Sequence, residues 1–438
     1  MKRQPVKRMR SIDMVRGIML LGMILAHGAV YEYARIFEVD FENPPLVIGI
    51  MGFFVLLGGS FIMMSGLVNT AAAVARIGEG QTSARAAGRN LAISGLVILV
   101  LNYLYVYFFG PATLDFDAKS LAMTMIPASI RAGALVVPSA RLLLDGSSIS
   151  IIAWDLLLMG GILTLLLRGG GTGGQASRSP GGPGGVAPAT RTRAYVVLSV
   201  LAAAVFALGF FRYLLYPAAP RAIAKGQWVS AVFLNLLLEK PYPLVPYFSF
   251  GVVGMIMGLA ATDPSPRRPL SVLLAVGILA LVVGAGLYVI MPATIGQVTV
   301  GWFSRVVLEL GLFMTVGSAL LRFRETGSAT RAEDRLPPPR RQRPQGFLGT
   351  IGRASLTIYF LQPPLSELLA RAANLVVPGW SDSLGLTMAF AAANVIAWAL
   401  VLLAWRAVSY RYSLDWVYAR VLAALGRESL RDRIDGRD

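Results

Sequence analysis

Long uncharged apolar segments recur from one end of this chain to the other. Many are about 20 residues long, which is the length that a helix rising 1.5 Å per residue needs to cross roughly 30 Å of hydrocarbon. The composition agrees, because 55% of the 438 residues are hydrophobic and only 14% are charged. That is too apolar for a soluble protein. The sequence therefore predicts an all-α fold, a polytopic transmembrane helix bundle.

About ten spans are predicted from the apolar segments. They are residues 14–34, 45–70, 90–109, 147–167, 194–213, 244–262, 270–292, 303–322, 347–371 and 384–408. Basic residues gather in alternate loops, such as Arg85 and Arg89 after the second span, whereas Glu32 and Glu38 follow the first. By the positive-inside rule, both termini are predicted to be cytoplasmic. Topology thus accounts for the excess of 40 Lys and Arg over 23 Asp and Glu, and no nucleic-acid partner is expected.

One apolar region does not fit this pattern. Residues 121–145 are interrupted by Pro127, Arg131, Pro138 and Arg141. Counting the region as a span would reverse the orientation of everything after it and place the basic loops outside. We therefore expect an outside-facing or re-entrant segment.

The predicted domain organisation is one transmembrane domain with a short tail. The domain covers residues 11–408 and includes two flexible cytoplasmic loops, at 169–193 and 323–346, which are rich in Gly, Ser, Pro and Arg. Residues 409–438 are predicted to be a cytoplasmic tail that begins with an amphipathic helix and is basic overall.

The first span carries the residues with the clearest chemical potential. Because Arg16 and His27 are eleven residues apart, close to three helical turns, they share one stripe of the helix about 16 Å apart. His27 is the only histidine of the chain, and an ionisable group inside a span usually faces protein or a wet cavity. The sequence has no cysteine, which excludes disulfides, thiolate metal sites and a cysteine nucleophile. No metal is expected.

These two residue types suggest proton transfer next to a phosphate-bearing donor. Imidazole can accept a proton from an attacking hydroxyl or amine near neutral pH. A guanidinium binds phosphate through a bidentate fork. Acyl-coenzyme A would fit the stripe, with its phosphates near Arg16 and its thioester near His27. The spacing alone is equally compatible with an interfacial arginine and a histidine that makes one interhelical hydrogen bond.

Several motifs resemble the transmembrane acyltransferase superfamily. The opening helix reads S-I-D-M-V-R-G-I-M-L-L-G-M-I-L-A-H, and its arginine, ten residues and histidine resemble the acyltransferase-3 branch. Later similar segments are F-I-M-M-S-G at 61–66, A-A-G-R-N-L-A-I-S-G-L at 86–96, W-D-L-L-L-M-G-G-I at 154–162, P-Y-F-S-F-G-V-V-G-M-I-M-G at 246–258, G-R-A-S-L-T-I-Y-F-L-Q at 352–362 and Y-S-L-D-W-V-Y-A-R at 412–420. Their order is similar to that in bacterial relatives of heparan-α-glucosaminide N-acetyltransferase. Gln362 stands where many members have histidine.

The resemblance implies transfer of an acetyl or other short acyl group from cytoplasmic acetyl-CoA or another acyl-CoA. The acceptor would be a glycan or glycolipid, such as a lipid-linked sugar, reached from the other side of a bacterial inner (plasma) membrane. His27 would be the base or acyl carrier, Arg16 a donor-site residue, and Asp13 the group that orients Arg16. Asp155 would support the site, although a hydrogen bond to a neighbouring helix is the simpler interpretation.

Two further arginines are secondary candidates for contact with the donor phosphates. Arg89 and Arg353 are both predicted at cytoplasmic helix ends, where positive-inside anchoring explains them equally well. The oligomeric state stays open, with a homodimer as one possibility.

Two other functions compete with the enzyme. In a proton-coupled transporter or flippase, His27, Asp155 and the Arg305–Glu309 pair would line a path across the bilayer. In a non-catalytic scaffold, none of them would be essential. Arg305 and Glu309 are one turn apart, so we expect them to neutralise each other.

Overall fold

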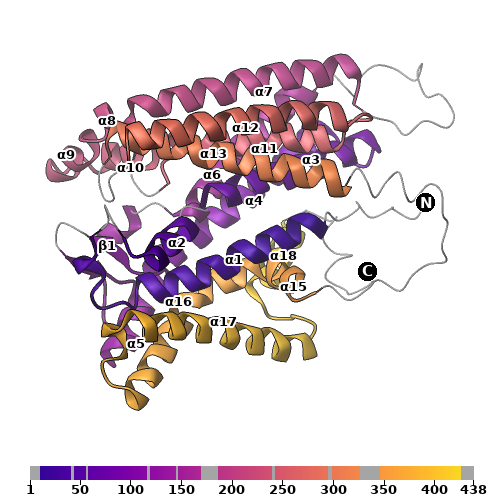
Figure 1. Ribbon diagram of the computed structural model, residues 1–438. Helices are drawn as coiled ribbons and strands as arrows, with labels where there is room; N and C mark the ends of the chain where they lie inside the picture. The colour runs from indigo at the N-terminus through magenta and orange to yellow at the C-terminus, as the bar shows by residue number, and fades with distance from the viewer. Residues whose placement is uncertain are drawn as a thin grey trace. The chain divides into compact units, whose positions relative to one another are not determined.

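The structure is a computed structural model, and it describes residues 10–40, 44–55, 58–115, 119–144, 147–168, 186–238, 242–293, 298–325 and 346–425 (Figure 1). Nine helices in this part of the chain are long and apolar enough to cross a membrane. The prediction of an all-α, multi-pass membrane protein is therefore confirmed. Apart from helices, the described residues contain one short hairpin, β1(Thr113–Asp115) and β2(Ser120–Ala122).

The chain divides into two compact units, which we describe one at a time. Unit 1 contains residues 1–11, 58–99 and 146–341, and unit 2 contains residues 12–57, 100–145 and 342–438, so that α1 belongs to unit 2 from Ile12 onward. Unit 1 has long helices α3(Gly58–Gly78), α4(Ala84–Leu104, as far as Leu99), α6(Ser148–Leu167), α7(Pro188–Leu208), α11(Leu244–Ala261), α12(Arg267–Ile290) and α13(Val300–Leu320). Its shorter elements are η5(Gly209–Phe211), α8(Arg212–Leu215), α9(Ala218–Ala224), α10(Trp228–Leu238) and η6(Leu321–Glu325).

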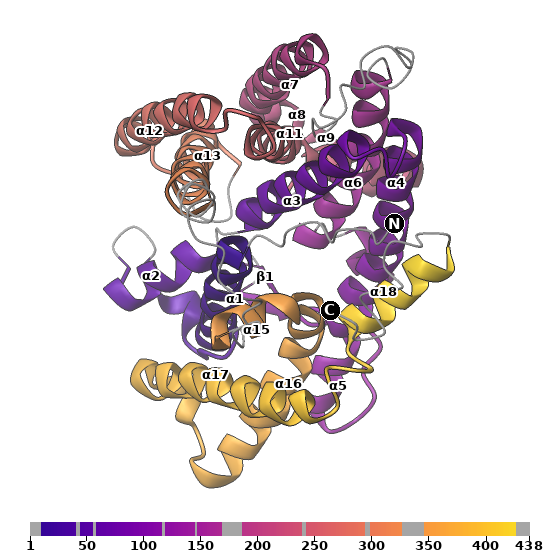
Figure 2. The same ribbon diagram turned by 90° about the vertical axis from the view of Figure 1, so that its right-hand side faces the viewer.

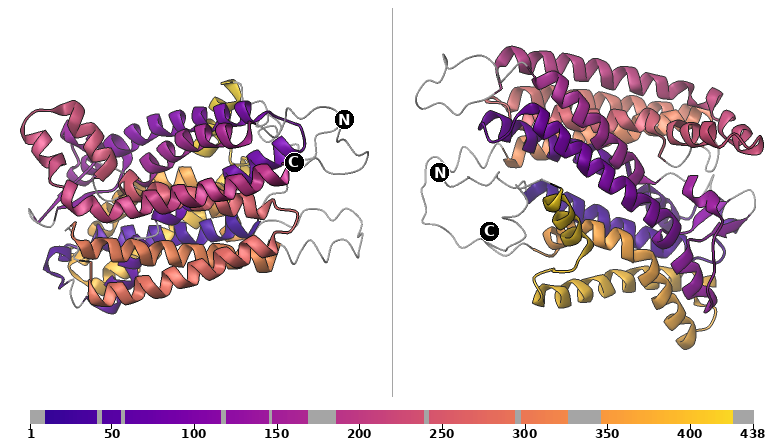
Figure 3. Two further views of the ribbon diagram at one scale, coloured as in Figure 1. Left: turned by 90° about the horizontal axis from the view of Figure 1, so that it is seen from above. Right: turned by 180° about the vertical axis from the view of Figure 1, so that it is seen from behind.

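Small residues allow the helices of unit 1 to pack closely, as in other membrane bundles. A methyl group added at Gly66 of α3 would collide with the carbonyl of Gly251 in α11. One added at Gly254 would collide in the same way with the carbonyl of Met63. The backbones of α3 and α11 are therefore in contact, and α7, α12 and α13 run alongside α11 in the same unit (Figure 3, left).

Unit 2 is built around the first helix. Its helices are α1(Arg10–Val30), α2(Leu46–Val55), α5(Met125–Ala132), α15(Phe347–Arg353), α16(Ser355–Val376), α17(Leu384–Ala407) and α18(Leu414–Ala424), with η1(Ile36–Glu38), η2(Tyr105–Phe109), η3(Ala140–Leu144) and η7(Trp380–Asp382) between them. Figure 2 shows α1, α15, α16 and α17 together. A methyl group at Gly17 would collide with the carbonyl of Leu348, and one at Gly352 with that of Asp13, so α15 lies directly against the start of α1.

Two predicted spans differ in detail from the helices. Helix α7 begins at Pro188, inside the loop predicted at 169–193, because proline is well suited to the first turn of a helix. The rest of that loop and most of 323–346 lie outside the described residues. Segment 347–371 is divided at Ala354 into α15 and α16 and is not one of the nine apolar spans of the described chain. Because α16 also carries Gln362, Ser366 and Glu367, it is less apolar than those spans.

Most of the irregular region 121–145 lies outside the candidate spans, as predicted, and only its end, from Ala140, belongs to the candidate span Ala140–Leu167. It forms β2, α5 and η3. The eight residues of α5 are too few to cross a bilayer. The predicted amphipathic tail helix is also present as α18, and residues 426–438 lie outside the described chain.

Candidate functional site

Helix α1 presents Arg16 and His27 on one side. The helix is continuous from Arg10 to Val30, so the two residues lie about 16 Å apart along its axis. Met19, Leu20 and Met23, which fall between them on this side, are 6%, 1% and 8% exposed, respectively, whereas Ile18 on the opposite side is 46% exposed. The stripe that joins Arg16 to His27 therefore faces protein.

The His27 side chain is paired with the side chain of Gln362 in α16. The Nδ1 atom lies 3.0 Å from Oε1 of Gln362, and Gln362 is only 1% exposed. Because a carbonyl oxygen can only accept, this contact is a hydrogen bond in the tautomer that carries its proton on Nδ1, and that tautomer leaves the lone pair of neutral imidazole on Nε2. Sequence reasoning noted Gln362 only as a departure from a family pattern and missed its role as the partner of His27.

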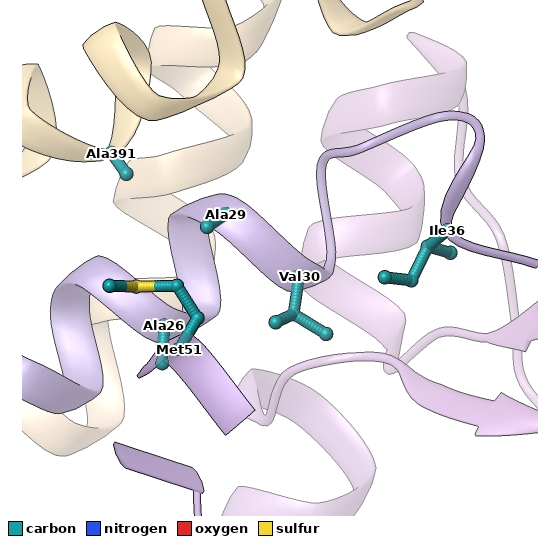
Figure 4. Close-up of a cluster of buried hydrophobic side chains, with 6 residues drawn as sticks. All are labelled: Ala26, Ala29, Val30, Ile36, Met51 and Ala391. Atoms are coloured by element: carbon teal, nitrogen blue, oxygen red, sulfur yellow. The ribbon is translucent and has the colours of Figure 1, made fainter. Parts of the chain in front are cut away.

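Small and apolar residues enclose the other sides of α1 at this level. Ala26, Ala29 and Val30 are buried against Met51 of α2 and Ala391 of α17 (Figure 4). The ring of Tyr31 lies edge-on to His27, with ring centroids 5.1 Å apart. His27 itself is only partly buried. Its imidazole is held by Gln362 and Tyr31 in an otherwise tightly packed region.

A carboxylate that the sequence did not single out lies beside Arg16. Asp415 of α18 accepts hydrogen bonds from the backbone N–H groups of Leu356 and Thr357, at 3.3 and 2.9 Å, and from the Thr357 hydroxyl, at 2.6 Å. It also interacts electrostatically with Arg16. Asp415 thus caps the start of α16 and places a negative charge near the predicted phosphate-binding guanidinium. The only signal in the sequence was its place in the closing Y-S-L-D-W motif.

Replacing Asp415 with alanine should loosen α18 from α16. The variant loses three hydrogen bonds, including two from N–H groups at a helix start. We expect its free energy of unfolding to be lower by about 1 to 2 kcal/mol. Thermal unfolding in detergent would measure this loss. Asp415→Asn, which keeps one side-chain acceptor, should lose less, and equal stability of all three proteins would contradict the capping role.

A second polar cluster lies beyond the other end of α1. Arg131 of α5 donates to both carboxylate oxygens of Glu367 in α16, at 2.8 and 2.6 Å, and its Nη2 also donates to Glu32 at 2.8 Å. The side chains of Glu32 and Glu367 are only 8% and 7% exposed, whereas that of Arg131 is 37% exposed. Sequence reasoning missed this cluster, although Arg131 had been noted as a charge inside an apolar segment.

Asp155, expected to support the site, belongs to α6 of unit 1, whereas His27 belongs to unit 2. It is fully buried, and neither of its carboxylate oxygens has a hydrogen-bond partner among the described residues. A methyl group at Gly251 of α11 would collide with the Asp155 carboxyl group. The interhelical hydrogen bond considered for Asp155 is therefore not formed, and its proposed support of the site stays a prediction.

The expected pairing of Arg305 with Glu309 in α13 is confirmed. The Nε atom of Arg305 lies 2.9 Å from Oε1 of Glu309, and the hydroxyl of Tyr247 in α11 donates to Oε2 of the same carboxylate, also at 2.9 Å. Glu309 is thus bonded on both oxygens and ties α13 to α11 inside unit 1.

The remaining predicted donor-site residues are found in both units. Asp13, which is buried, and Arg353, which is exposed, lie with Arg16 at the same end of unit 2, where α15 contacts α1. Arg89 is exposed on α4 in unit 1. No cluster of histidine and acidic residues suited to a metal ion occurs within the described ranges. A comparison with protein-family models, curated proteins and solved structures found no significant match.

Proposed function

We propose that this protein is a membrane-embedded acyltransferase. It would move an acetyl or other short acyl group from cytoplasmic acyl-CoA to a glycan, a lipid-linked sugar or a related acceptor. The observation that supports this proposal best is the bond between His27 and Gln362. A neutral imidazole held in this way has one defined nitrogen, Nε2, with a lone pair ready to take a proton.

In this mechanism His27 acts as a general base. Its Nε2 atom accepts the proton of the acceptor hydroxyl or amine while the oxygen or nitrogen attacks the thioester carbonyl carbon. The carbon–sulfur bond then breaks, and the departing thiolate takes the proton from the imidazolium to give free coenzyme A. Gln362 keeps the ring oriented throughout, because its Oε1 atom stays bonded to Nδ1–H. An acyl-imidazole intermediate on Nε2 is compatible with the same orientation.

Arg16 would hold the donor phosphates at the opposite end of the stripe, assisted by Arg353. The position of Arg16 on the side of α1 that faces protein supports its role in phosphate binding. Asp415 is the competing anion for this guanidinium. Phosphates would therefore share Arg16 with Asp415.

Arg16→Ala is expected to weaken binding of acyl-CoA about tenfold or more, because a charge-assisted hydrogen bond contributes roughly 1.5 to 3 kcal/mol. Turnover at saturating donor should change much less. Calorimetry with acetyl-CoA and initial-rate kinetics would separate the two effects. Arg411→Ala, which removes an exposed arginine between α17 and α18, serves as the control. Unchanged affinity in the Arg16 variant would remove this residue from the donor site.

The finer topology is also part of the proposal. His27 contacts Gln362, and five residues further along the chain in each case Glu32, in the turn after α1, and Glu367, on α16, share Arg131. Helices α1 and α16 therefore run in the same direction over a common length. If α16 crosses the membrane as α1 does, the protein has ten spans, and the positive-inside rule places both termini in the cytoplasm. The site would then belong to a plasma membrane, as expected for a bacterial protein.

A proton-coupled transporter or flippase is the second candidate, and Asp155 favours it. An ionisable group buried inside a span is a common feature of proton pathways. The two functions are separated by donor use. Purified protein in lipid nanodiscs should bind and slowly hydrolyse acetyl-CoA if it is the enzyme. Absence of both, together with proton-coupled uptake of a solute by proteoliposomes, would reject the acyltransferase. Mass spectrometry of surface glycans and lipids from a deletion strain, showing one missing acyl group, would identify the acceptor.

A further inference from the structure

The cluster of Glu32, Arg131 and Glu367 joins three separate parts of unit 2. One guanidinium donates two hydrogen bonds to Glu367 on α16 and one to Glu32 at the end of α1, while its own backbone belongs to α5. A further bond from Arg371 of α16 to the carbonyl of Ile130, at 3.3 Å, fixes α5 on the same helix. Arg131 is therefore the link through which α5 fastens α1 to α16.

This link has the same register as the bond at His27. His27 and Gln362 are 335 positions apart in the sequence, and so are Glu32 and Glu367. Each acidic residue lies five positions beyond the polar residue of the first pair, which is about 7.5 Å along the axis of α16 for Gln362 and Glu367, whereas Glu32 lies in the turn just after α1. A shift of α16 along α1 that moved Glu367 away from Glu32 would move Gln362 away from His27 by the same amount.

The cluster also has an imbalance of charge. Two carboxylates share one guanidinium, and both are nearly inaccessible to solvent. Burial, together with the nearby Glu367 carboxylate, raises the pKa of Glu32 to about 8, although Arg131 opposes this rise. The groups that face Glu32 are Glu367 and Ser366 on α16 and Arg131 on α5, and Arg371 of α16 bonds the Ile130 carbonyl next to Arg131. Because the folded pKa is raised, the bound proton stabilises the cluster below the ordinary carboxyl pKa, and this stabilisation is lost as the pH rises through about 8.

We propose that Arg131 is a positioning residue for His27: by bonding Glu32 and Glu367 together, it keeps α1 and α16 in the register that lets Gln362 fix the imidazole with its proton on Nδ1. The proposal assigns a role in the site to α5 and to the region around it. Its structural part is independent of the reaction, whereas its effect on turnover rests on the proposed acyltransferase function.

The single histidine of the chain makes the test direct. In protein labelled only with ¹⁵N-histidine, every imidazole signal comes from His27. The wild type should show one neutral tautomer, with the proton on Nδ1. Arg131→Gln should show a mixture of both tautomers, since Gln362 is no longer held in register. Arg35→Gln is the matched control. Arg35 lies three residues after Glu32 and forms an exposed ion pair with Glu38, so this variant should retain the wild-type spectrum. A wild-type spectrum in Arg131→Gln would overturn the proposal.

Glu32→Gln provides a second test that keeps the size and polarity of the side chain. The wild type should lose the single-tautomer signal progressively as the pH rises from about 7 to about 9, because Glu32 gives up its proton in this range. Glu32→Gln cannot ionise and should keep the signal throughout. Identical pH profiles for the two proteins would mean that the charge of Glu32 does not affect the register, and would overturn this part of the proposal.

Acyl transfer supplies the functional part of the test. Misplacement of a reacting group by about 1 Å can cost about a hundredfold in rate, and we expect a loss of that order in turnover for Arg131→Gln, with little change in affinity for acetyl-CoA. If the tautomer changes as expected but neither protein transfers an acyl group, the acyltransferase proposal fails and the positioning role stands. If turnover falls and the tautomer is unchanged, the positioning role fails and the acyltransferase proposal stands.

Discussion

Replacing His27 with alanine is expected to abolish acyl transfer and to leave the protein folded. A general base contributes about a hundredfold to ten-thousandfold to the rate of a reaction, and the chain has no second histidine to replace it. The side chain makes one hydrogen bond, to Gln362, and is only partly buried, so its loss removes little packing. Transfer of labelled acetyl from acetyl-CoA by the purified protein would measure the effect.

Two controls are needed for this variant. The size-exclusion profile should match that of the wild type, the unfolding temperature should fall by only a few degrees because Gln362 loses one hydrogen bond, and affinity for acetyl-CoA should be retained because Arg16 is unchanged. Gln362→Leu removes only the bond to Nδ1 and should reduce turnover less than His27→Ala does. Normal turnover by His27→Ala would exclude His27 as the base and would favour the transporter or the scaffold.

Replacing Glu309 with alanine is expected to produce the largest loss of stability. The carboxylate is 4% exposed and bonded to both Arg305 and Tyr247. Its removal leaves a guanidinium and a fully buried hydroxyl inside unit 1 without their partner. Breaking a buried ion pair by removing one member typically costs about 3 to 5 kcal/mol, because the remaining charge stays desolvated. Thermal or denaturant unfolding in a constant detergent would show the change.

The exposed pair of Arg35 and Glu38 is the matched comparison. The Nε atom of Arg35 lies 2.6 Å from Oε2 of Glu38, which is closer than the contact between Arg305 and Glu309, but the two side chains are 58% and 62% exposed. Such exposed pairs contribute little to stability because water screens them. Glu38→Ala should therefore unfold like the wild type. The double variant Arg305→Leu with Glu309→Leu should recover much of the stability lost in Glu309→Ala, since no unpaired charge remains. Full stability of Glu309→Ala would mean that Arg305 reaches water or lipid headgroups.

Local features of the sequence were sufficient to predict several side-chain relationships. Arg305 and Glu309 are four positions apart, and helix geometry alone brings residues at that spacing together. The shared side of Arg16 and His27 follows in the same way from an unbroken α1. The nature of region 121–145 was also readable, because prolines and charges prevent it from forming an apolar helix of sufficient length.

Contacts between distant segments could not be predicted in this way. Arg131 is 236 positions from Glu367 and 99 from Glu32. Asp415 is 58 positions from Thr357 and accepts hydrogen bonds from its backbone N–H group and its hydroxyl. Each of these bonds depends on which helices are neighbours and how far one is shifted along the other, and charge or hydropathy along the chain does not specify either.

By itself, the sequence determined that this protein is a helical membrane protein with one histidine inside its first span. A bilayer accepts only segments in which every backbone group is bonded internally, so length and apolarity alone are enough to identify such helices. The tertiary structure decided what that histidine contacts: Gln362 on one ring nitrogen, Tyr31 beside the ring, and the Arg131 cluster beyond it. The bond to Gln362 and the Arg131 cluster depend on the register between α1 and α16, which arises only when the helices pack.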